Sequence, residues 1–381
     1  MQFEYYNPTR ILFGAQQIAQ LNRVIPAEAR VLVLYGGGSI KRNGVYDQVT
    51  EALEGRAWSE FGGIEPNPAI ETLNQAVERV RAEKVDFLLA VGGGSVIDGT
   101  KYVAAAACYE GDGWDILTGR HTVTEAVPLG AVLTLPATGS ESNAGSVVSR
   151  KATQEKLFFM SPAVIPQFAV LDPDVIRSLP ERQKVNGIVD AFVHVSEQYI
   201  TAPNDAWVQS GYAETLLRVL VELGRNRHSQ TDAWRANLMW AANQALNGLI
   251  GSGVAQDWAT HMIGHELTAR YGVDHARSLA IVQPWLLRDQ IEAKRARLNR
   301  LGTVVFNLAD GPDLAERTVD AIEAFYHGLE VETRLTDYGE SKEEAITAIL
   351  EQLERHNMVA LGESQSITLD VSRRILEQAI A

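Results

Sequence analysis

Four of the eight histidines in this 381-residue chain lie in two short segments, and one of those segments also carries an aspartate. Asp190 and His194 are four residues apart, as are His261 and His265, and His275 follows ten residues later. A spacing of four places two side chains on one face of a helix. Three imidazoles and one carboxylate suit a divalent ion such as Fe²⁺ or Zn²⁺. Each pair alone is equally compatible with buried hydrogen bonding, so the metal site depends on the two segments meeting.

Two glycine runs offer a different chemistry, the binding of phosphate groups. Gly92-Gly93-Gly94-Ser95 follows an apolar run and opens an alanine-rich segment. Glycine lets the backbone approach a ligand closely, and the free N–H groups at the start of a helix favour an anion. The run suits a pyrophosphate, although it is not the G-x-G-x-x-G fingerprint and a tight turn without ligand is an equal alternative.

The first glycine run, Gly36-Gly37-Gly38-Ser39, indicates which dinucleotide is bound. NAD-binding enzymes commonly place an acid there to bond the ribose 2′-hydroxyl. Here no carboxylate is present in the run, and Lys41 and Arg42 follow it. Backbone N–H groups, a serine hydroxyl and cations suit a 2′-phosphate, which predicts NADP instead of NAD. The alternative is that Lys41 and Arg42 are ordinary surface charges.

The segments around these residues predict two domains. Apolar runs at 30–35, 86–91, 129–135 and 168–171 alternate with helical spacing such as that of 68–84. This alternation is typical of a parallel sheet covered on both faces, a Rossmann-like α/β fold with ligand loops such as 138–142 at the carboxyl ends of the strands. After about residue 178 only helical patterns follow, for example 186–200, 205–223 and 233–249. We therefore expect an α/β dinucleotide-binding domain over 1–179 and an all-helical metal-binding and substrate domain over 180–381.

Composition excludes several other classes of protein. The formal net charge of -14, with both signs interspersed, argues against nucleic acid as a partner. No apolar segment is long enough to span a bilayer, and the first residues do not resemble a signal peptide. The single cysteine, Cys108, lies beside an apolar run, so we expect a small buried residue in a cytoplasmic, reducing compartment.

Taken together, these motifs resemble the iron-dependent, or group III, alcohol dehydrogenases over essentially the whole chain. Within that family the sequence is most similar to NADPH-dependent aldehyde reductases and butanol dehydrogenases. Besides the aspartate and histidine segments, the segments that carry the resemblance are 7–14, 62–68, 92–101 and 135–141. The same architecture resembles dehydroquinate synthase and glycerol dehydrogenase, which stay as alternatives. The missing acid in the first glycine run counts against both. A non-catalytic binding or assembly protein is a further alternative, although such a protein has no need of intact ligands and phosphate loops.

The resemblance implies a role for each candidate residue. It makes four residues the metal ligands, namely Asp190, His194, His261 and His275. It places His265 near the nicotinamide and the substrate. It implies these cofactor contacts: Gly37, Gly38 and Ser39 at the 2′-phosphate; Gly93, Gly94 and Ser95 at the pyrophosphate; Thr138 and Ser140 along the ribose and phosphates; and Asn67 and Lys156 near the cofactor. The family name says iron, but similar sites hold zinc.

The reaction expected from this resemblance is metal-assisted hydride transfer between NADPH and an aldehyde, reversible toward alcohol oxidation. His265 is the candidate for the proton path, with solvent or a ribose hydroxyl as alternatives. Trp258, Met262 and Ile263 could line an apolar pocket, which would discriminate weakly between short and medium alkyl chains. The resemblance also implies a homodimer.

Overall fold

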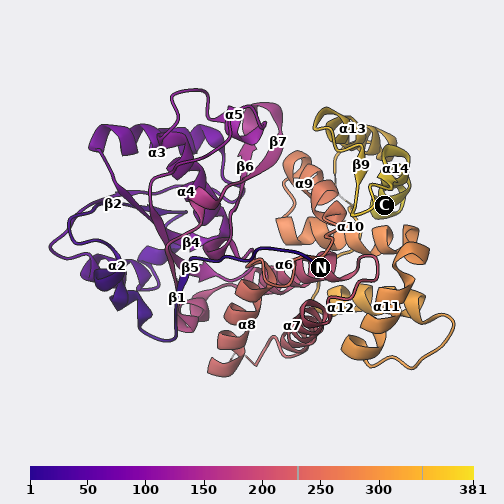
Figure 1. Ribbon diagram of the computed structural model, residues 1–381. Helices are drawn as coiled ribbons and strands as arrows, with labels where there is room; N and C mark the ends of the chain where they lie inside the picture. Colours follow the sequence, from indigo (N-terminus) through magenta and orange to yellow (C-terminus); the bar gives the residue numbers. More distant parts are fainter. Residues whose placement is uncertain (230, 337) are drawn as a thin grey trace. The chain divides into compact units, whose positions relative to one another are not determined.

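The computed structural model describes residues 1–229, 231–336 and 338–381. The chain forms two compact units (Figure 1). The first, which we call the α/β unit, comprises residues 6–184 and 231–247. The second, the helical unit, comprises residues 1–5, 185–229 and 248–381. The domain boundary predicted between residues 179 and 180 stays a prediction.

A six-stranded parallel sheet forms the centre of the α/β unit, in the order β1-β8-β5-β4-β2-β3. Its strands are β1 (Arg10–Phe13), β2 (Arg30–Tyr35), β3 (Ala57–Phe61), β4 (Phe87–Gly93), β5 (Leu129–Leu135) and β8 (Phe168–Leu171). The four central strands are apolar and almost entirely buried, as expected of parallel strands covered on both faces. The predicted α/β fold with a parallel sheet is confirmed.

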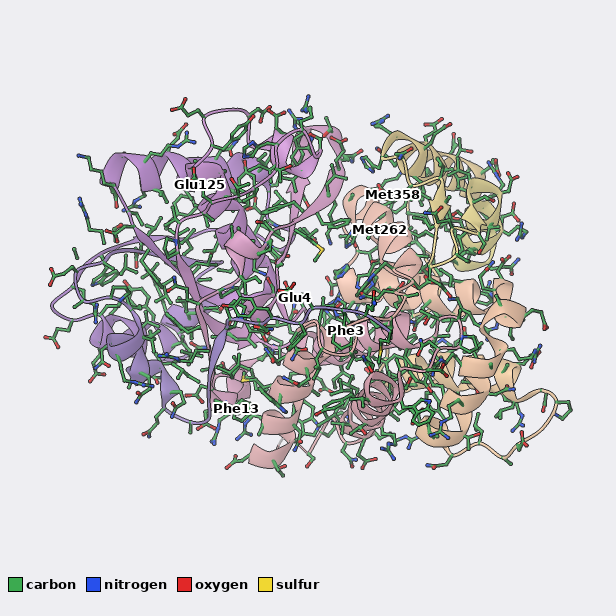
Figure 2. All side chains as sticks on the ribbon, viewed as in Figure 1. Phe3, Glu4, Phe13, Glu125, Met262 and Met358 are labelled. Carbon is green, nitrogen blue, oxygen red and sulfur yellow. The ribbon has the colours of Figure 1, made fainter. Side chains whose placement is uncertain are left out.

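Helices and one hairpin complete this unit. The helices are α1 (Leu21–Val24), α2 (Val45–Ala52), α3 (Ile70–Glu83), α4 (Gly94–Ala107), α5 (Trp114–Leu117) and α8 (Asp232–Ala245). The hairpin pairs β6 (Gly145–Arg150) with β7 (Glu155–Met160) in antiparallel fashion. Helix α4 packs on β4, β5 and β6, and lies beside α3 (Figure 1). In the same unit Phe13, labelled in Figure 2, packs edge-on against Trp240 of α8, with 5.6 Å between ring centroids.

The helical unit consists of α6 (Glu181–Tyr199, shared with the α/β unit through its first turn), α7 (Trp207–Arg225), α9 (Ala259–Tyr271), α10 (His275–Asp289), α11 (Ile291–Phe306), α12 (Leu314–Gly328), α13 (Lys342–Arg355) and α14 (Leu369–Ala379). The predicted helical C-terminal region is confirmed. It also contains one short antiparallel ladder, β9 (Ala360–Leu361) with β10 (Ile367–Thr368), which the helical patterns did not reveal. None of the helices in the described ranges is both long and apolar enough to cross a membrane.

Two helices carry three of the candidate metal ligands. Asp190 and His194 lie in the buried middle of α6, while His275 is the first residue of α10, which packs against α9. The expectation that Cys108 is buried was wrong. It is exposed, because it caps the C-terminus of α4, where the chain leaves the apolar environment of the helix.

Candidate functional site

The loops that carry the candidate cofactor residues leave three adjacent strands of the sheet. Strands β5, β4 and β2 are neighbours and run parallel, so their carboxyl ends lie at one edge. The segments 36–39 and 138–142 follow the ends of β2 and β5, and 92–95 spans the end of β4 and the start of the next helix. Open α/β sheets bind ligands at this edge.

The first glycine loop turns from β2 into a short 3₁₀ helix, Ser39–Lys41. Gly38 has a φ of +83°, a conformation that glycine adopts without steric cost. A Cβ added to Gly37 or Gly38 would meet nothing within 4 Å, and Gly37 and Ser39 are exposed. The space in front of the loop is therefore open to a ligand.

The cation that follows this loop is held by an acid. Lys41 Nζ lies 2.8 Å from Glu60 Oε1, and it stands over the rings of Tyr35 and Tyr46, 4.9 Å and 4.5 Å from their centroids. Both tyrosine hydroxyls donate to Glu60, at 3.1 Å from Tyr35 and 2.5 Å from Tyr46. The hydrogen bond to Glu60 raises the pKa of Lys41. The sequence analysis identified Lys41 but missed Glu60, which lies on the edge strand β3.

The second glycine loop leads directly from β4 into α4, whose first residue is Gly94. A Cβ on Gly94 would lie 2.5 Å from Thr138 Oγ1, and one on Gly93 would lie 2.9 Å from Leu135 Cβ. The glycines are therefore needed for packing within the chain as well as for any ligand. They place the Thr138 hydroxyl at the N-terminus of a 14-residue helix, where anions bind.

Three further candidates lie together beside this loop. The backbone N–H of Asn67 donates to Ser95 Oγ at 3.4 Å, and Lys156 Nζ donates to Asn67 Oδ1 at 3.0 Å. Asn67 has a φ of +55°, which is uncommon outside glycine and marks a conformation imposed by its surroundings. Asn67, Ser95 and Lys156 thus form one polar group, as their shared assignment to the cofactor requires.

Ser140 is only 2% exposed, and its side chain is bonded within the chain. Its hydroxyl donates to Asp98 Oδ1 at 2.5 Å, and its backbone N–H donates to Thr138 Oγ1 at 3.2 Å. Asp98 is itself buried in α4, and desolvation raises the pKa of its carboxyl. The sequence analysis did not single out Asp98.

In the helical unit, ligand atoms of Asp190, His261 and His275 lie within 4.8 Å of one another. His275 Nε2 is 3.6 Å from Asp190 Oδ1, and His194 Nδ1 is 3.7 Å from the same oxygen. Two ligands about 2.1 Å from an ion in tetrahedral geometry are about 3.4 Å apart. The separations of 3.6 and 3.7 Å are close to this value. The group of Asp190, His261 and His275, which does not include His194, offers the imidazole nitrogens and carboxylate that suit Fe²⁺ or Zn²⁺.

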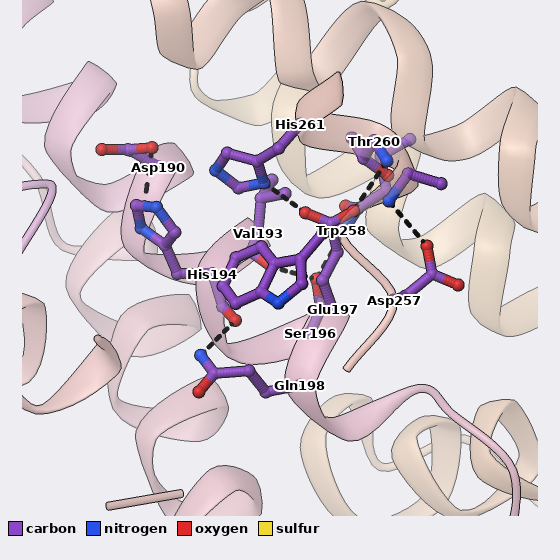
Figure 3. A network of polar contacts seen from close by, with 12 residues as sticks. Asp190, Val193, His194, Ser196, Glu197, Gln198, Asp257, Trp258, Thr260 and His261 are labelled. Atoms are coloured by element: carbon purple, nitrogen blue, oxygen red, sulfur yellow. Dashed lines mark hydrogen bonds and ion pairs between the residues drawn. The ribbon is translucent and has the colours of Figure 1, made fainter. Parts of the chain in front are cut away.

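His194 and His265 lie beside this group. The ring of His194 stacks on His261 with 4.6 Å between centroids (Figure 3). Burial lowers the pKa of His194 to about 4, which keeps the imidazole neutral, as a metal ligand must be. The ring of His265 is 5.1 Å from that of His275 and 6.2 Å from that of His261. Two segments of sequence thus bring four buried or half-buried imidazoles together with one carboxylate.

A second acid orients one of these histidines. Glu197 Oε2 is hydrogen-bonded to His261 Nδ1, and its Oε1 accepts the backbone N–H of Thr260 at 2.7 Å (Figure 3). Burial raises the pKa of Glu197. Contact with a carboxylate through one ring nitrogen fixes the orientation of a metal-binding histidine and leaves Nε2 for the ion. The sequence analysis missed Glu197, although it follows Asp190 and His194 by helical spacing on α6.

Of the three apolar residues proposed for a substrate pocket, Trp258 has its ring beside those of two histidines. Its indole ring is 5.3 Å from the ring of His261 and 6.2 Å from that of His194 (Figure 3). Met262 is half-buried, whereas Ile263 is fully buried and belongs to the core. Trp258 has a φ of +61° at the start of α9, so its position is imposed by the surrounding structure.

Comparison with known proteins identifies the family. The model of the iron-containing alcohol dehydrogenases matches residues 8–173, and that of the C-terminal region of the Fe-containing alcohol dehydrogenase family matches 184–379. The NADPH-dependent aldehyde reductase YqhD of Escherichia coli is 56% identical over 99% of both chains. A probable NADH-dependent butanol dehydrogenase of Bacillus subtilis is 40% identical over 91% of this chain and 92% of its own. The crystal structure of E. coli YqhD superposes with a TM-score of 0.97 at 55% identity, covering 99% of this chain and 98% of that one. The chain belongs to the iron-containing alcohol dehydrogenase family.

Proposed function

We propose that the protein reduces short and medium-chain aldehydes with NADPH in a metal-dependent reaction that also runs toward alcohol oxidation. The observation that carries this proposal is the group formed by Asp190, His261 and His275, whose ligand atoms lie within 4.8 Å of one another. Membership of the alcohol dehydrogenase family and 56% identity to an NADPH-dependent aldehyde reductase support it.

Four residues would hold the divalent ion: Asp190, His194, His261 and His275. A bound divalent ion would supply Lewis-acid chemistry toward an aldehyde carbonyl, and NADPH would supply the hydride. Glu197 holds the ring of His261 in the orientation that presents Nε2 to the ion. Trp258, beside His194 and His261, excludes water and offers an apolar surface to the alkyl chain.

The product alcohol requires a proton, and we assign its delivery to His265. The side chain is 4% exposed, and its ring lies 5.1 Å from the ring of His275. A buried imidazole beside the ligands is suited to holding a proton for transfer to the oxygen of the product. His265 thus acts on the substrate and does not serve as a ligand.

The cofactor assignment rests on the α/β unit. The proposed contacts are Gly37, Gly38 and Ser39 for the 2′-phosphate, Gly93, Gly94 and Ser95 for the pyrophosphate, and Asn67, Thr138 and Lys156 for the rest of the cofactor. Ser140, predicted along the ribose and phosphates, is buried and bonded to Asp98. The open first loop lacks a carboxylate of its own and is followed by Lys41, which supports NADPH. The relatives include both NADPH-dependent and probable NADH-dependent enzymes, so the preference of this chain is to be measured.

We further propose a homodimer in the cytoplasm. Helix α7 carries three exposed apolar side chains that a second copy could cover, namely Trp207, Val208 and Tyr212. A single cysteine supports a reducing compartment.

Consumption of reduced cofactor with butyraldehyde tests the proposed function. NADPH and NADH are compared on metal-replete protein, and turnover is expected to favour NADPH strongly. Turnover with NADH alone would keep the reductase and refute the cofactor preference. Absence of turnover with both, on protein shown to contain metal, would refute aldehyde reduction.

A further inference from the structure

The hydroxyl of Thr138 is held at the start of α4 by contacts that leave its proton available. The backbone N–H of Ser140 donates to Thr138 Oγ1 at 3.2 Å and so occupies one lone pair. Within the part of the chain that the structure describes, the Thr138 hydroxyl has no acceptor for its own proton. Because a Cβ on Gly94 would lie 2.5 Å from this oxygen, the hydroxyl stands directly at the helix N-terminus.

The hydroxyl of Ser140, in contrast, is already engaged. A serine hydroxyl has one proton, and that of Ser140 goes to Asp98 Oδ1 at 2.5 Å. The side chain is 2% exposed, so little of it is open to a ligand. Phosphate oxygens at neutral pH chiefly accept hydrogen bonds, and Ser140 Oγ has no second proton to offer them. Direct contact between Ser140 and the pyrophosphate is therefore disfavoured by both exposure and hydrogen-bond direction.

Asp98 fixes the loop that contains Ser140. Its second carboxylate oxygen accepts the backbone N–H of Val147 at 3.2 Å, and its backbone carbonyl accepts the hydroxyl of Ser146 at 2.8 Å. Asp98 thus connects both the segment after β5 and the first residues of β6 to α4. A buried carboxylate is costly unless its oxygens accept hydrogen bonds, and here the Ser140 hydroxyl and the Val147 N–H each donate to one of them.

We propose that Asp98 and Ser140 are positioning residues that aim the Thr138 hydroxyl at a phosphate of the dinucleotide. In this arrangement Thr138 is the contact, Ser140 acts through Thr138, and Asp98 acts through Ser140. This inference rests on the proposed function, since it assumes a dinucleotide at the carboxyl edge of the sheet. It changes the assignment of Ser140 from a cofactor contact to a residue behind the contact.

A double-mutant cycle on cofactor affinity tests the order of these residues. Thr138→Val keeps the shape and removes the hydroxyl, and the loss of one hydrogen bond to a charged group predicts a Kd for NADPH about 10-fold higher or more. Ser140→Ala and Asp98→Asn are expected to raise the Kd about 3-fold, because the Thr138 hydroxyl is then less well aimed. In the Thr138→Val background, Ser140→Ala is expected to add nothing. Thr138→Ser, which keeps the hydroxyl, should bind NADPH with about the affinity of the wild-type protein.

Adenosine 2′-monophosphate, which lacks the pyrophosphate, separates positioning from loss of structure. Its affinity should be unchanged in every variant, and kcat at saturating NADPH should stay within 2-fold for Asp98→Asn and Ser140→Ala while KM for NADPH rises. An effect of Ser140→Ala that is undiminished in the Thr138→Val background would overturn the proposal, as would weaker binding of adenosine 2′-monophosphate.

The cycle is run with NADH as well. Binding of NADH alone by the wild-type protein would refute the cofactor preference while still testing the order of the residues. Binding of neither dinucleotide would refute both proposals.

Discussion

Two glutamates, each distant in sequence from the side chain that it binds, hold the side chains of a proposed metal ligand and of the lysine after the first glycine loop. Glu197 holds His261 through Nδ1, and Glu60 holds Lys41 beside the first glycine loop. The first follows Asp190 by seven residues on one helix, a spacing that points to the same face, so the sequence contained a signal for it. The second lies on another strand, and only the pairing of β2 with β3 brings it to the loop.

Substitution of Glu197 by glutamine should weaken metal binding about 10- to 100-fold, because the His261 ring loses its carboxylate partner. Activity should fall in the same proportion at limiting metal and recover at excess metal. Substitution of His261 by alanine should remove metal and activity together. Metal content by elemental analysis and chelator competition provide the measurement.

Glu266 offers a matched control for this experiment. It is a buried glutamate on α9 that contacts His356 Nδ1 at 2.8 Å, and His356 is not a proposed ligand. Glu266→Gln should leave metal affinity unchanged. An active His261→Ala variant without metal would refute the ligand assignment, and equal effects of Glu197→Gln and Glu266→Gln would refute the specific role of Glu197.

The pair formed by Lys41 and Glu60 predicts how cofactor preference can be changed. Glu60 neutralises Lys41, which follows the proposed 2′-phosphate loop. Glu60→Gln should therefore tighten NADPH binding several-fold without affecting NADH binding, and the gain should shrink at high salt. Lys41→Met should weaken NADPH alone. Titration of both cofactors at two ionic strengths measures this. Glu83→Gln, which breaks another exposed ion pair of the same unit with Arg79, should change neither affinity.

Among the elements, the buried strands were predictable and the partly exposed ones were not. The apolar runs at 30–35, 129–135 and 168–171 coincide with β2, β5 and β8, because strands buried on both faces are apolar throughout. The edge strands β1 and β3 are half-exposed and carry polar residues, so no continuous run marks them. The β6–β7 hairpin was not predicted either, because strands with mixed burial carry polar residues and resemble a polar loop in sequence.

Helix α4 carries a buried lysine whose titration should make the free energy of unfolding depend on pH. Lys101 Nζ donates to Asn143 Oδ1 at 3.0 Å and to the carbonyl of Gly145 at 2.7 Å, and burial lowers its pKa from 10.5 to about 8. Between these values the unfolded chain binds more protons than the folded protein, so stability from this group rises with pH from 8 to 10.5 and is lost as pH falls to 8.

Lys101→Met should remove this rise. The free energy of unfolding of the wild-type protein should increase relative to that of the variant by up to about 1.4 kcal/mol per pH unit in this window. Urea denaturation at several pH values measures the difference. Lys342→Met, at an exposed position that begins α13, is the control and should follow the wild type. Parallel pH profiles for Lys101→Met and the wild type would show that Lys101 is not a source of this dependence.

For the whole molecule, sequence order indicated the fold class but not the assignment of every helix. Residues 231–247, which include α8, follow two helices of the helical unit yet cluster with the α/β unit. The contacts responsible join residues about a hundred positions apart, as where Asn243 Nδ2 donates to Glu141 Oε1 at 2.8 Å. Periodicity describes what surrounds each residue locally, so it cannot identify such partners.

The proposed homodimer is the property of the whole molecule that is most directly measurable. Helix α7 exposes 82% of Trp207 and 69% of Val208, and a second copy covering them would bury apolar area that a monomer leaves in water. Sedimentation at micromolar concentration should give twice the chain mass of 41.8 kDa. Trp207→Glu should shift the protein toward the monomer, because a charge cannot be buried there without a partner. Val359→Glu, at another exposed apolar position of the same unit, should leave the dimer intact. A monomeric wild-type protein would refute the dimer, and a dimer insensitive to Trp207→Glu would place its interface on another surface.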